Sequence, residues 1–176
     1  MNFKSASDIS HKRELWKQTS ELFNGIFENL YVKGITADIY RLSIPYKNHE
    51  IKISESETRP LKFEIELKSL FYYQLTMGWE DSFEKFLNRF RKSEIEIGQK
   101  EFDSHYLIQS NDKEKTIKFF SSEIVKSFLK NNIYSLAIGT NKNRKANLIS
   151  VSGKNIEEKE SMFNLIHLHF KIIDKL

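Results

Sequence analysis

Hydrophobic and charged residues alternate most regularly over residues 61–68. The hydrophobic positions are Leu61, Phe63, Ile65 and Leu67, and each residue between them carries a charge. Successive side chains of a β-strand point to opposite faces, so this pattern predicts a strand with one face in the core and one face in water. Residues 71–77 repeat the alternation after a short connection, which predicts a second strand paired antiparallel with the first.

Six further segments have the hydrophobic pattern of strands. They are residues 35–44, 51–53, 94–97, 105–109, 133–139 and 146–151. Short connections predict two hairpins, one between residues 94–97 and 105–109 and the other between residues 133–139 and 146–151. In the first of the six segments the hydrophobic phase shifts between Ile39 and Tyr40, which indicates a bulge or two buried faces.

Three segments instead repeat their hydrophobic residues at intervals of three and four, which places these side chains on one face of a helix. Ser7 or Asp8 can cap the first helix and Asn155 the last, because short polar side chains accept hydrogen bonds from the free amides of a first turn. The segments are residues 7–30 (with Leu15, Leu22, Phe23, Ile26, Phe27 and Leu30), residues 80–92 (with Phe83, Phe86, Leu87 and Phe90) and residues 155–176.

The central helical region is predicted by two entry signals. The run Ser-Asn-Asp at 110–112 indicates a helix that begins near Lys113. Ser121 precedes a second helical pattern that extends to Leu129. These pieces form either two helices or one bent helix.

Together the elements predict an α+β fold, in which a largely antiparallel sheet of about eight strands is flanked by N-terminal, central and C-terminal helices. A chain of 176 residues has the usual size of one domain, so we expect a single domain over residues 1–176. The alternative is two separate sheets that meet near Ser93.

The predicted C-terminal helix carries two adjacent hydrophobic rows. If the sheet covers the first row, another element must cover part of the second. The N-terminal helix with Leu15, Leu22 and Ile26 is one candidate, and a second subunit is the other, so a homodimer through the C-terminal helix is our expectation. The rows are Phe163, Ile166, Phe170 and Ile173, and Met162, Leu165, His169 and Ile172.

The composition narrows the classes of protein. The chain has no cysteine, which excludes disulfides, thiolate zinc sites, iron–sulfur clusters and cysteine nucleophiles. No segment has the length and apolar character of a transmembrane helix and the first residues do not form a signal peptide, so a cytoplasmic location is expected. The net charge of +4 does not favour nucleic acid as a partner.

Residues 152–155, between a strand and a helix, have the placement of a phosphate-binding loop. However, Leu148 stands in the position of the leading glycine, and Asn155 replaces the hydroxyl residue that would bind Mg²⁺. An ordinary capped turn fits these residues better.

Glu64 and Glu66 lie on one strand face at about 6–7 Å, a spacing that two catalytic carboxylates can use. Lys62 and Lys68 flank them on the same face. A solvated strand surface explains this pattern better than an active site.

The histidines do not form a recognisable site either. His167 and His169 point about 200° apart around a helix and cannot share a metal ion, so His169 is expected at the edge of the core. Asp103, Ser104 and His105 include the residue types of a catalytic triad, but neighbours in sequence do not position a nucleophile. We therefore assign no catalytic, cofactor-binding or metal-binding residue.

A basic hairpin tip is the clearest charge feature. Residues 133–154 contain no acidic residue, and their positive charges come from Lys142, Arg144, Lys145 and Lys154. These residues are candidate contacts for phosphate, anionic lipid or an acidic protein surface. The other interpretation is a solvated turn, since no aromatic residue lies within the tip to stack on a base.

Residues 93–152 resemble an uncharacterised bacterial family of domains of unknown function. The resemblance rests on Glu101-Phe102, on Tyr106-Leu107-Ile108 and on the run Ser-Asn-Asp at 110–112, followed by a helix and a hairpin. The family usually has Thr-Pro where this chain has Ser121-Ser122, and many members carry membrane-spanning helices that are missing here. The resemblance implies a fold and supplies no catalytic residues.

Three functional hypotheses remain. The leading one is a non-catalytic interaction or scaffold domain, because the sequence shows no assembled set of acid, base, nucleophile or metal ligands. The second is a small-molecule or lipid binder that lines a cavity with some of the 14 phenylalanines. The third is an enzyme of unknown class, with a site that collects Glu64, Glu66, His49 or His105.

Overall fold

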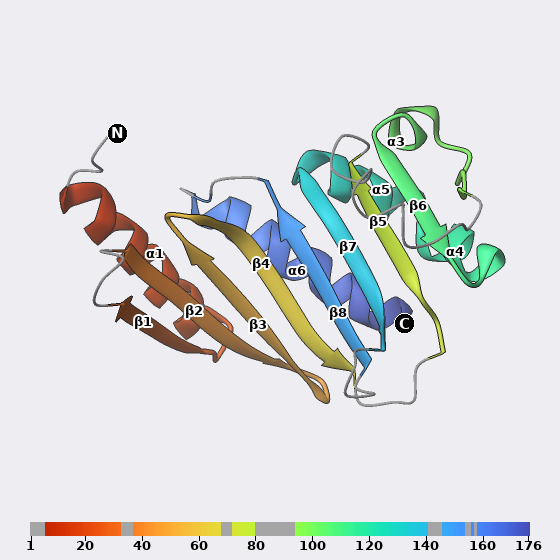
Figure 1. Ribbon diagram of the computed structural model, residues 1–176. Coiled ribbons are helices and arrows are strands. Elements are labelled where there is room, and N and C mark those ends of the chain that lie inside the picture. Colours follow the sequence, from red (N-terminus) through yellow and green to blue (C-terminus); the bar gives the residue numbers. More distant parts are fainter. Residues whose placement is uncertain are drawn as a thin grey trace.

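Eight strands form a single antiparallel sheet (Figure 1). The computed structural model describes residues 6–32, 37–67, 72–79, 94–140, 146–153, 156 and 158–176. The strand order is β1-β2-β3-β4-β8-β7-β5-β6, and every neighbouring pair is antiparallel. The strands are β1 (Ile26–Val32), β2 (Ala37–Tyr46), β3 (His49–Ser56), β4 (Arg59–Leu67), β5 (Leu75–Trp79), β6 (Tyr106–Ser110), β7 (Ile133–Thr140) and β8 (Ala146–Ser152).

The long helices of the described residues cover one face of this sheet. In Figure 1, α1, α5 and α6 pass behind the strands, with α6 crossing the central strands and α1 lying behind β1 and β2. The opposite face of β1 to β4 carries no described helix. The helices are α1 (Ala6–Leu22), α3 (Lys100–Asp103), α4 (Lys113–Phe119), α5 (Ser122–Lys130) and α6 (Lys159–Lys175).

The core lies between the sheet and these helices. Alternate residues of β3, β4 and β8 are buried, as the hydrophobic alternation predicts. At the other end of the sheet, Phe102, Phe120 and Phe128 contact one another with ring centroids 5.3 to 6.3 Å apart. The buried residues of the central layer include Phe63, Ile65, Leu148, Met162, Leu165 and Ile172.

The predicted α+β class and the antiparallel sheet are confirmed, and the alternative of two separate sheets is wrong. Pairing between β4 and β8 joins the strands before Ser93 to those after it. The predicted helix at 80–92 lies outside the described residues.

The prediction of one helix over 7–30 is wrong in its second half. The helix ends at Leu22, and residues 26–32 form the edge strand β1. Asn24 has a left-handed φ of 51°, which breaks the helix. A Cβ atom on Gly25 would lie 2.7 Å from the carbonyl oxygen of Ser43, so glycine lets the turn pass close to β2.

Two predicted strand pairings also differ from the structure. β4 pairs with β3 and β8, whereas β5 pairs with β6 and β7, so the expected hairpin between residues 61–67 and 71–77 does not form. Residues 94–97 are not a regular strand, although the Ile95 amide donates to the Ile108 carbonyl at 2.9 Å. The hairpin of β7 and β8 is confirmed.

The C-terminal helix begins at Lys159, later than the predicted start at Asn155. Its second row, with Met162, Leu165, His169 and Ile172, is fully buried. The sheet covers this row, as the contact between His169 and Phe63 shows. This row therefore needs no second subunit, and homodimerisation through α6 stays a prediction without that support.

Phe23, in the turn that follows α1, packs on the first row of α6. The Phe23 ring lies 5.2 Å from Phe163 and 5.8 Å from Phe170. Leu22 and Ile26, which were expected to cover the helix, are 55% and 69% exposed. The end of the β2–β3 hairpin completes the cover, because Tyr46 stacks on Phe170 at 3.8 Å.

The central region forms two helices, not one bent helix. The Asp112 carboxylate accepts a hydrogen bond from the Lys115 amide at 2.9 Å, which confirms the predicted cap of α4. Ser121 occupies the cap position of α5, but its side chain caps nothing, and its buried Oγ has no hydrogen-bond partner.

Substitution of these two cap residues is expected to have unequal effects. Asp112→Ala removes a hydrogen bond to the first turn of α4 and should lower the free energy of unfolding by about 1 kcal/mol. Ser121→Ala removes no cap bond and should change it by less than about 0.5 kcal/mol. Urea denaturation followed by circular dichroism measures both, and equal losses would contradict the assignment of the caps.

Candidate binding groove on the open sheet face

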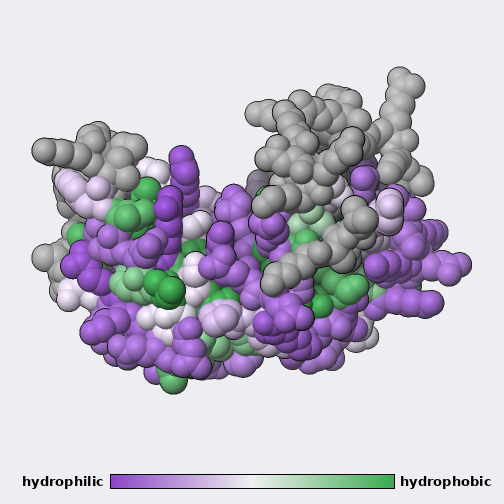
Figure 2. All heavy atoms as spheres, turned by 90° about the horizontal axis from the view of Figure 1, so that it is seen from below, coloured by the Kyte–Doolittle hydropathy of each residue, from purple (hydrophilic) through white to green (hydrophobic). Residues whose placement is uncertain are grey.

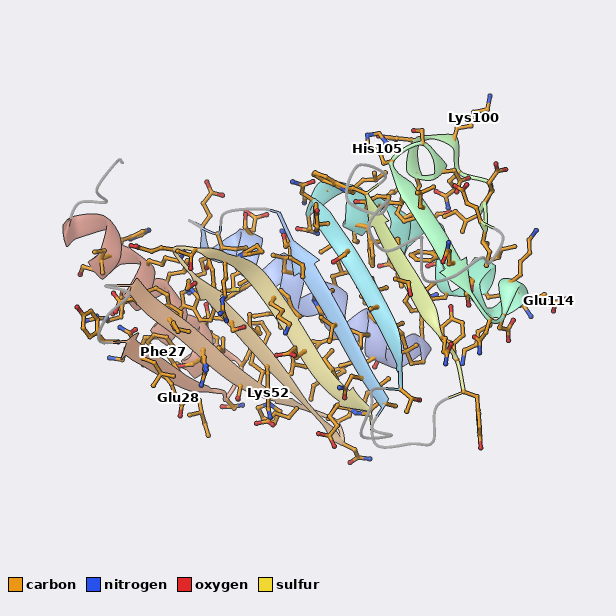
Figure 3. The ribbon with its side chains drawn as sticks, viewed as in Figure 1. Phe27, Glu28, Lys52, Lys100, His105 and Glu114 are labelled. Carbon is orange, nitrogen blue, oxygen red and sulfur yellow. The ribbon has the colours of Figure 1, made fainter. Side chains whose placement is uncertain are left out.

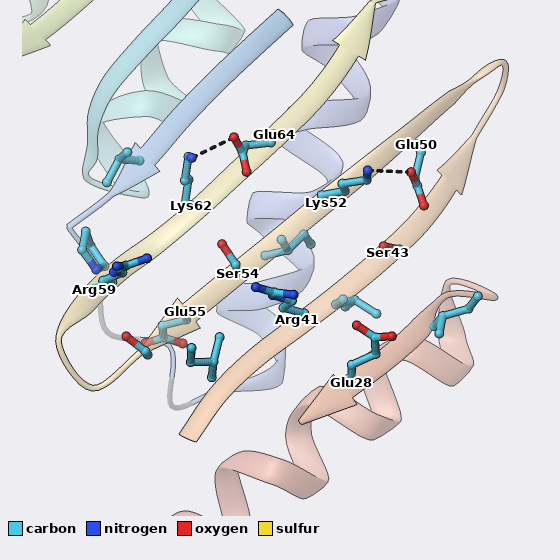
Figure 4. Close-up of a pocket in the computed structure, with 17 residues that line it drawn as sticks. Glu28, Arg41, Ser43, Glu50, Lys52, Ser54, Glu55, Arg59, Lys62 and Glu64 are labelled. Atoms are coloured by element: carbon cyan, nitrogen blue, oxygen red, sulfur yellow. Dashed lines mark ion pairs between the residues drawn. The ribbon is translucent and has the colours of Figure 1, made fainter. Parts of the chain in front are cut away.

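The face of the sheet opposite α6 carries a groove of about 790 Å³ (Figure 4). Its walls come from β1 to β4, with Val151 of β8 at one side. Along these strands, side chains point alternately to the core and to the open face. The hydrophobic side chains fill the core, and the polar side chains between them line the groove.

Most charged side chains in the groove form ion pairs. Lys62 Nζ lies 2.8 Å from Glu64, and Lys52 Nζ lies 3.3 Å from Glu50 (Figure 4). These exposed pairs contribute little to stability, but they neutralise four of the charges on the groove.

Arg41 and Arg59 form no ion pair with any residue that the structure describes. Arg41 lies opposite Glu28 in the register of β1 and β2. Its guanidinium nevertheless lies on the side of β2 away from Glu28 (Figure 4). Both arginines therefore present free hydrogen-bond donors to the groove.

The groove also has apolar surface. Ile26 lines the β1 side of the groove and is 69% exposed, and Ile39 lies farther along, opposite Leu30 on the neighbouring strand. In the view from below, hydrophobic side chains show between hydrophilic ones across the molecule (Figure 2). The groove can thus hold a ligand that combines acidic and apolar groups.

Glu55 anchors the N-terminal helix beside the groove. It is almost fully buried, and one carboxylate oxygen lies 2.7 Å from Lys12 Nζ of α1. Lys12 also lies 5.6 Å from the ring centroid of Tyr40. Burial, with Asp38 adding to it, raises the pKa of Tyr40, so this phenol stays neutral.

The residues considered for catalysis are dispersed in the structure. Glu64 pairs with Lys62, and His49 Nδ1 lies 3.2 Å from the backbone oxygen of Glu66. His105 lies at the other end of the sheet from Lys52 (Figure 3). Among the residues that the structure describes, no group of three His, Cys, Asp or Glu side chains could hold a metal ion.

The triad-like run at 103–105 has structural contacts. The Asp103 carboxylate accepts hydrogen bonds from the amides of Ile97 and Gln99, at 2.9 and 2.8 Å. His105 Nδ1 lies 2.6 Å from the Glu101 carbonyl oxygen, so it donates there. Asp103 therefore orders the loop before α3 and does not orient His105.

His169 is fully buried instead of lying at the core edge. Its Nδ1 donates to the Leu165 carbonyl at 2.7 Å, which leaves Nε2 to accept from the Ser150 hydroxyl at 2.5 Å. The ring stacks on Phe63 at 3.8 Å. Burial lowers its pKa to about 4, while the hydrogen bond to Leu165 opposes this shift. This pair joins α6 to β8 out of reach of any substrate.

The basic hairpin tip lies outside the part of the chain that the structure describes. Lys142, Arg144, Lys145 and Lys154 all lie outside the described residues, as does Asn155 of the loop considered for phosphate. Their role as contacts for an anionic partner stays a prediction.

The phenylalanines pack against other side chains in the described part of the protein. Three surface grooves lined by described residues contain no phenylalanine in their walls. Phe63, Phe102 and Phe128 are fully buried in the core cluster. None of these three grooves is therefore the phenylalanine-lined cavity of the second functional hypothesis.

The sequence analysis did not identify Arg41 and Arg59. Arg41 occupies an ordinary outward position of an amphipathic strand, whereas Arg59 precedes the strand predicted at 61–68 and is the first residue of β4, so only the structure shows that both line the groove. Arg41 could have been found from the strand predicted at 35–44. Side chains alternate along a strand, so Arg41 points away from the face on which its neighbours Tyr40 and Leu42 are buried.

The fold defines a class of α+β domain with an antiparallel sheet, helices on one face and an open opposite face. A similar fold occurs in the crystal structure of the mycobacterial trehalose monomycolate transport factor A, TtfA, with a TM-score of 0.55. The two chains are 10% identical, and the match covers 98% of this chain and 97% of TtfA, so the likeness concerns the fold.

The sequence comparisons add no relative. No family model matches the chain, and no curated protein matches it in sequence. None of the helices in the described ranges has the length and apolar character needed to cross a membrane.

Proposed function

We propose that this protein is a non-catalytic interaction domain that binds another protein through the open face of β1 to β4. The observation that carries the proposal is the pair of unpartnered arginines, Arg41 and Arg59, in a groove that no described helix covers. Exposed guanidinium groups bind carboxylates in two-pronged hydrogen bonds, and arginine is enriched at protein interfaces.

The expected ligand is an acidic segment of a partner protein with interspersed apolar side chains. Its carboxylates would bind Arg41 and Arg59, and its apolar side chains would contact Ile26 and Ile39. The ion pairs of Lys52 and Lys62 would border this contact and add little affinity, since exposed pairs are weak. A long groove with mixed polarity resembles a transient protein interface more closely than an enclosed small-molecule pocket.

The second candidate function is a lipid or small-molecule binder that uses the same groove. The fold likeness to TtfA, named as a transport factor for trehalose monomycolate, favours this candidate. The charged lining of the groove counts against it, because apolar ligands are bound mostly by apolar walls. The resemblance to the bacterial family of unknown function and a cytoplasmic location also stay proposals.

Photo-cross-linking in cells tests the proposal. A benzophenone amino acid replaces exposed Lys52 in the groove, and in a matched control it replaces exposed Lys126 on α5. The groove position should give a protein adduct that the control position does not. Arg41→Glu with Arg59→Glu should reduce its yield at least about tenfold, the cost expected when two charge-assisted contacts are lost.

The charge control is Lys126→Glu with Lys130→Glu, which changes the net charge by the same amount on the helical face. It should leave the adduct unchanged. An adduct with the mass of a lipid would favour the second candidate, and an adduct insensitive to both arginines would show that the groove is not the binding surface.

A further inference from the structure

Strand β1 is an open edge of the sheet. It pairs with β2 on one side, and no described strand lies on its other side. Alternate residues of an edge strand present free N–H and C=O groups that another strand can pair with. β1 therefore offers a binding surface that is separate from the groove residues Arg41 and Arg59.

This edge lacks the features that usually prevent strand pairing. Its sequence Ile-Phe-Glu-Asn-Leu-Tyr-Val contains no proline, lysine or arginine, and Glu28 is its one charged residue. The opposite edge, β6, has only five residues, and the amide of Ile95 already donates to Ile108 there. Of the two edges, β1 is longer and less protected.

Exposed hydrophobic side chains gather at the same edge. The described part of the chain has six large hydrophobic residues that are strongly exposed, and four of them belong to β1 or to the end of α1. Phe27 and Glu28 lie together at this end of the sheet (Figure 3). The four residues are Leu22 (55% exposed), Ile26 (69%), Leu30 (37%) and Tyr31 (65%).

The sequence of β1 is complementary to itself in the antiparallel direction. With a two-fold axis at Asn29, Phe27 lies opposite the partner's Tyr31, and Glu28 lies opposite the partner's Leu30. Aromatic pairs stabilise neighbouring strands, and this register places no like charges directly opposite each other. An axis at Glu28 would instead place two carboxylates opposite each other, which is unfavourable.

Asn29 gives a second reason for this register. Its side-chain oxygen is buried and has no hydrogen-bond partner in the described structure. On the two-fold axis the two Asn29 residues lie directly opposite each other, and a turn of each side chain toward the partner lets its amide donate to the partner's Asn29 oxygen. Such a pair satisfies a group that is otherwise unsatisfied, and it fixes the register of the two strands.

We infer that two copies of this chain form a two-fold dimer in which β1 pairs antiparallel with the partner's β1, centred on Asn29. The two eight-stranded sheets then form one continuous sheet. The exposed apolar residues Leu30 and Tyr31 become contacts across the new strand pair. The dimer shares Ile26 and Glu28 with the β1 side of the groove, and it does not use α6.

Sedimentation velocity over a wide concentration range tests the dimer. The wild-type chain should sediment as a species of twice 20.9 kDa and dissociate on dilution. Leu30→Glu should raise the dissociation constant at least about tenfold, because it places a second carboxylate directly opposite the partner's Glu28 on both sides of the axis. Ile117→Glu is the matched control, since Ile117 is 40% exposed on α4, close to the 37% of Leu30.

A single introduced cysteine tests the register, because the chain has no cysteine of its own. Asn29→Cys should form a disulfide-linked dimer on mild oxidation, since directly opposite residues have Cβ atoms about 4.5–5.5 Å apart. Tyr31→Cys should not, because two copies of residue 31 lie about 13 Å apart along the strands in this register.

Three results would overturn the inference. They are a chain that stays at 20.9 kDa at all concentrations, a dimer that Leu30→Glu and Ile117→Glu weaken equally, and Tyr31→Cys cross-linking faster than Asn29→Cys. A dimer that Leu30→Glu dissociates and that Asn29→Cys traps as a disulfide-linked species supports it.

Discussion

Acidification from pH 6.5 to pH 4 is expected to lower the free energy of unfolding by about 3 kcal/mol through His169 alone. Burial lowers the pKa of this imidazole to about 4, so in the folded protein it stays neutral until the lower end of this range. The unfolded chain binds a proton near pH 6.5, and each pH unit below this value favours unfolding by about 1.4 kcal/mol. Above pH 6.5 and below pH 4, the folded and unfolded states bind equal numbers of protons at His169, so its effect on stability no longer changes with pH.

A double variant isolates the contribution of His169. His169→Phe with Ser150→Ala keeps an aromatic ring against Phe63 and removes both members of the buried hydrogen bond. Urea denaturation at pH 7 and at pH 4.5 should show a smaller loss of stability in the variant than in the wild-type chain. The lowered pKa values of Glu123 and Asp174 are common to both proteins and cancel in this comparison. Equal losses in the two proteins would show that His169 does not cause the acid sensitivity.

The sequence predicts an element well where one pattern dominates locally. The alternation at Leu61 to Leu67 defines β4, and the short polar run before Lys113 defines the start of α4. Both signals depend on side chains within a few residues of one another. The confirmed fold class follows from such segments, because their period and length determine which faces must be buried.

The main errors arise where distant residues decide the structure. A helical spacing fits Phe23, Ile26, Phe27 and Leu30. The helix nevertheless ends before Asn24 and Gly25, and residues 26–32 pair with β2 as a strand. Asn-Gly is a helix-stop signal, and giving it more weight than the hydrophobic period would have corrected this prediction. The pairing of β4 with β8 could not be read locally, because about 80 residues separate the two strands along the chain.

The candidate site depends even more on tertiary structure. The sequence places Arg41 within a predicted strand and Arg59 in the connection before one, and they line a groove on the face away from α1, α5 and α6. The exposure of Ile26 and Leu30 likewise follows from the position of β1 at the sheet edge. Composition and period cannot reveal which side of a sheet its helices cover.

Removal of the Trp16 side chain is expected to lower the free energy of unfolding by about 3–5 kcal/mol, because Trp16 joins α1 to the first strands of the sheet. Trp16 is fully buried, and its ring lies 5.7 Å from Tyr40 and 6.2 Å from Phe27. Trp16→Ala would leave a large cavity between α1 and β2. A loss of this size is a third or more of the stability of many domains, and urea denaturation followed by circular dichroism measures it.

Two further variants separate packing from general damage to the helix. Trp16→Phe keeps a ring in the site and removes the indole N–H, which has no hydrogen-bond partner in the described structure, so the loss should stay below about 1.5 kcal/mol. Leu22→Ala changes a 55% exposed residue of the same helix and should cost less than about 0.5 kcal/mol. If Trp16→Ala costs no more than Leu22→Ala, α1 does not pack on the sheet through Trp16. If only Trp16→Ala is strongly destabilising, the contact with Phe27 and Tyr40 holds α1 and β1 together, and the position of the β1 edge depends on it.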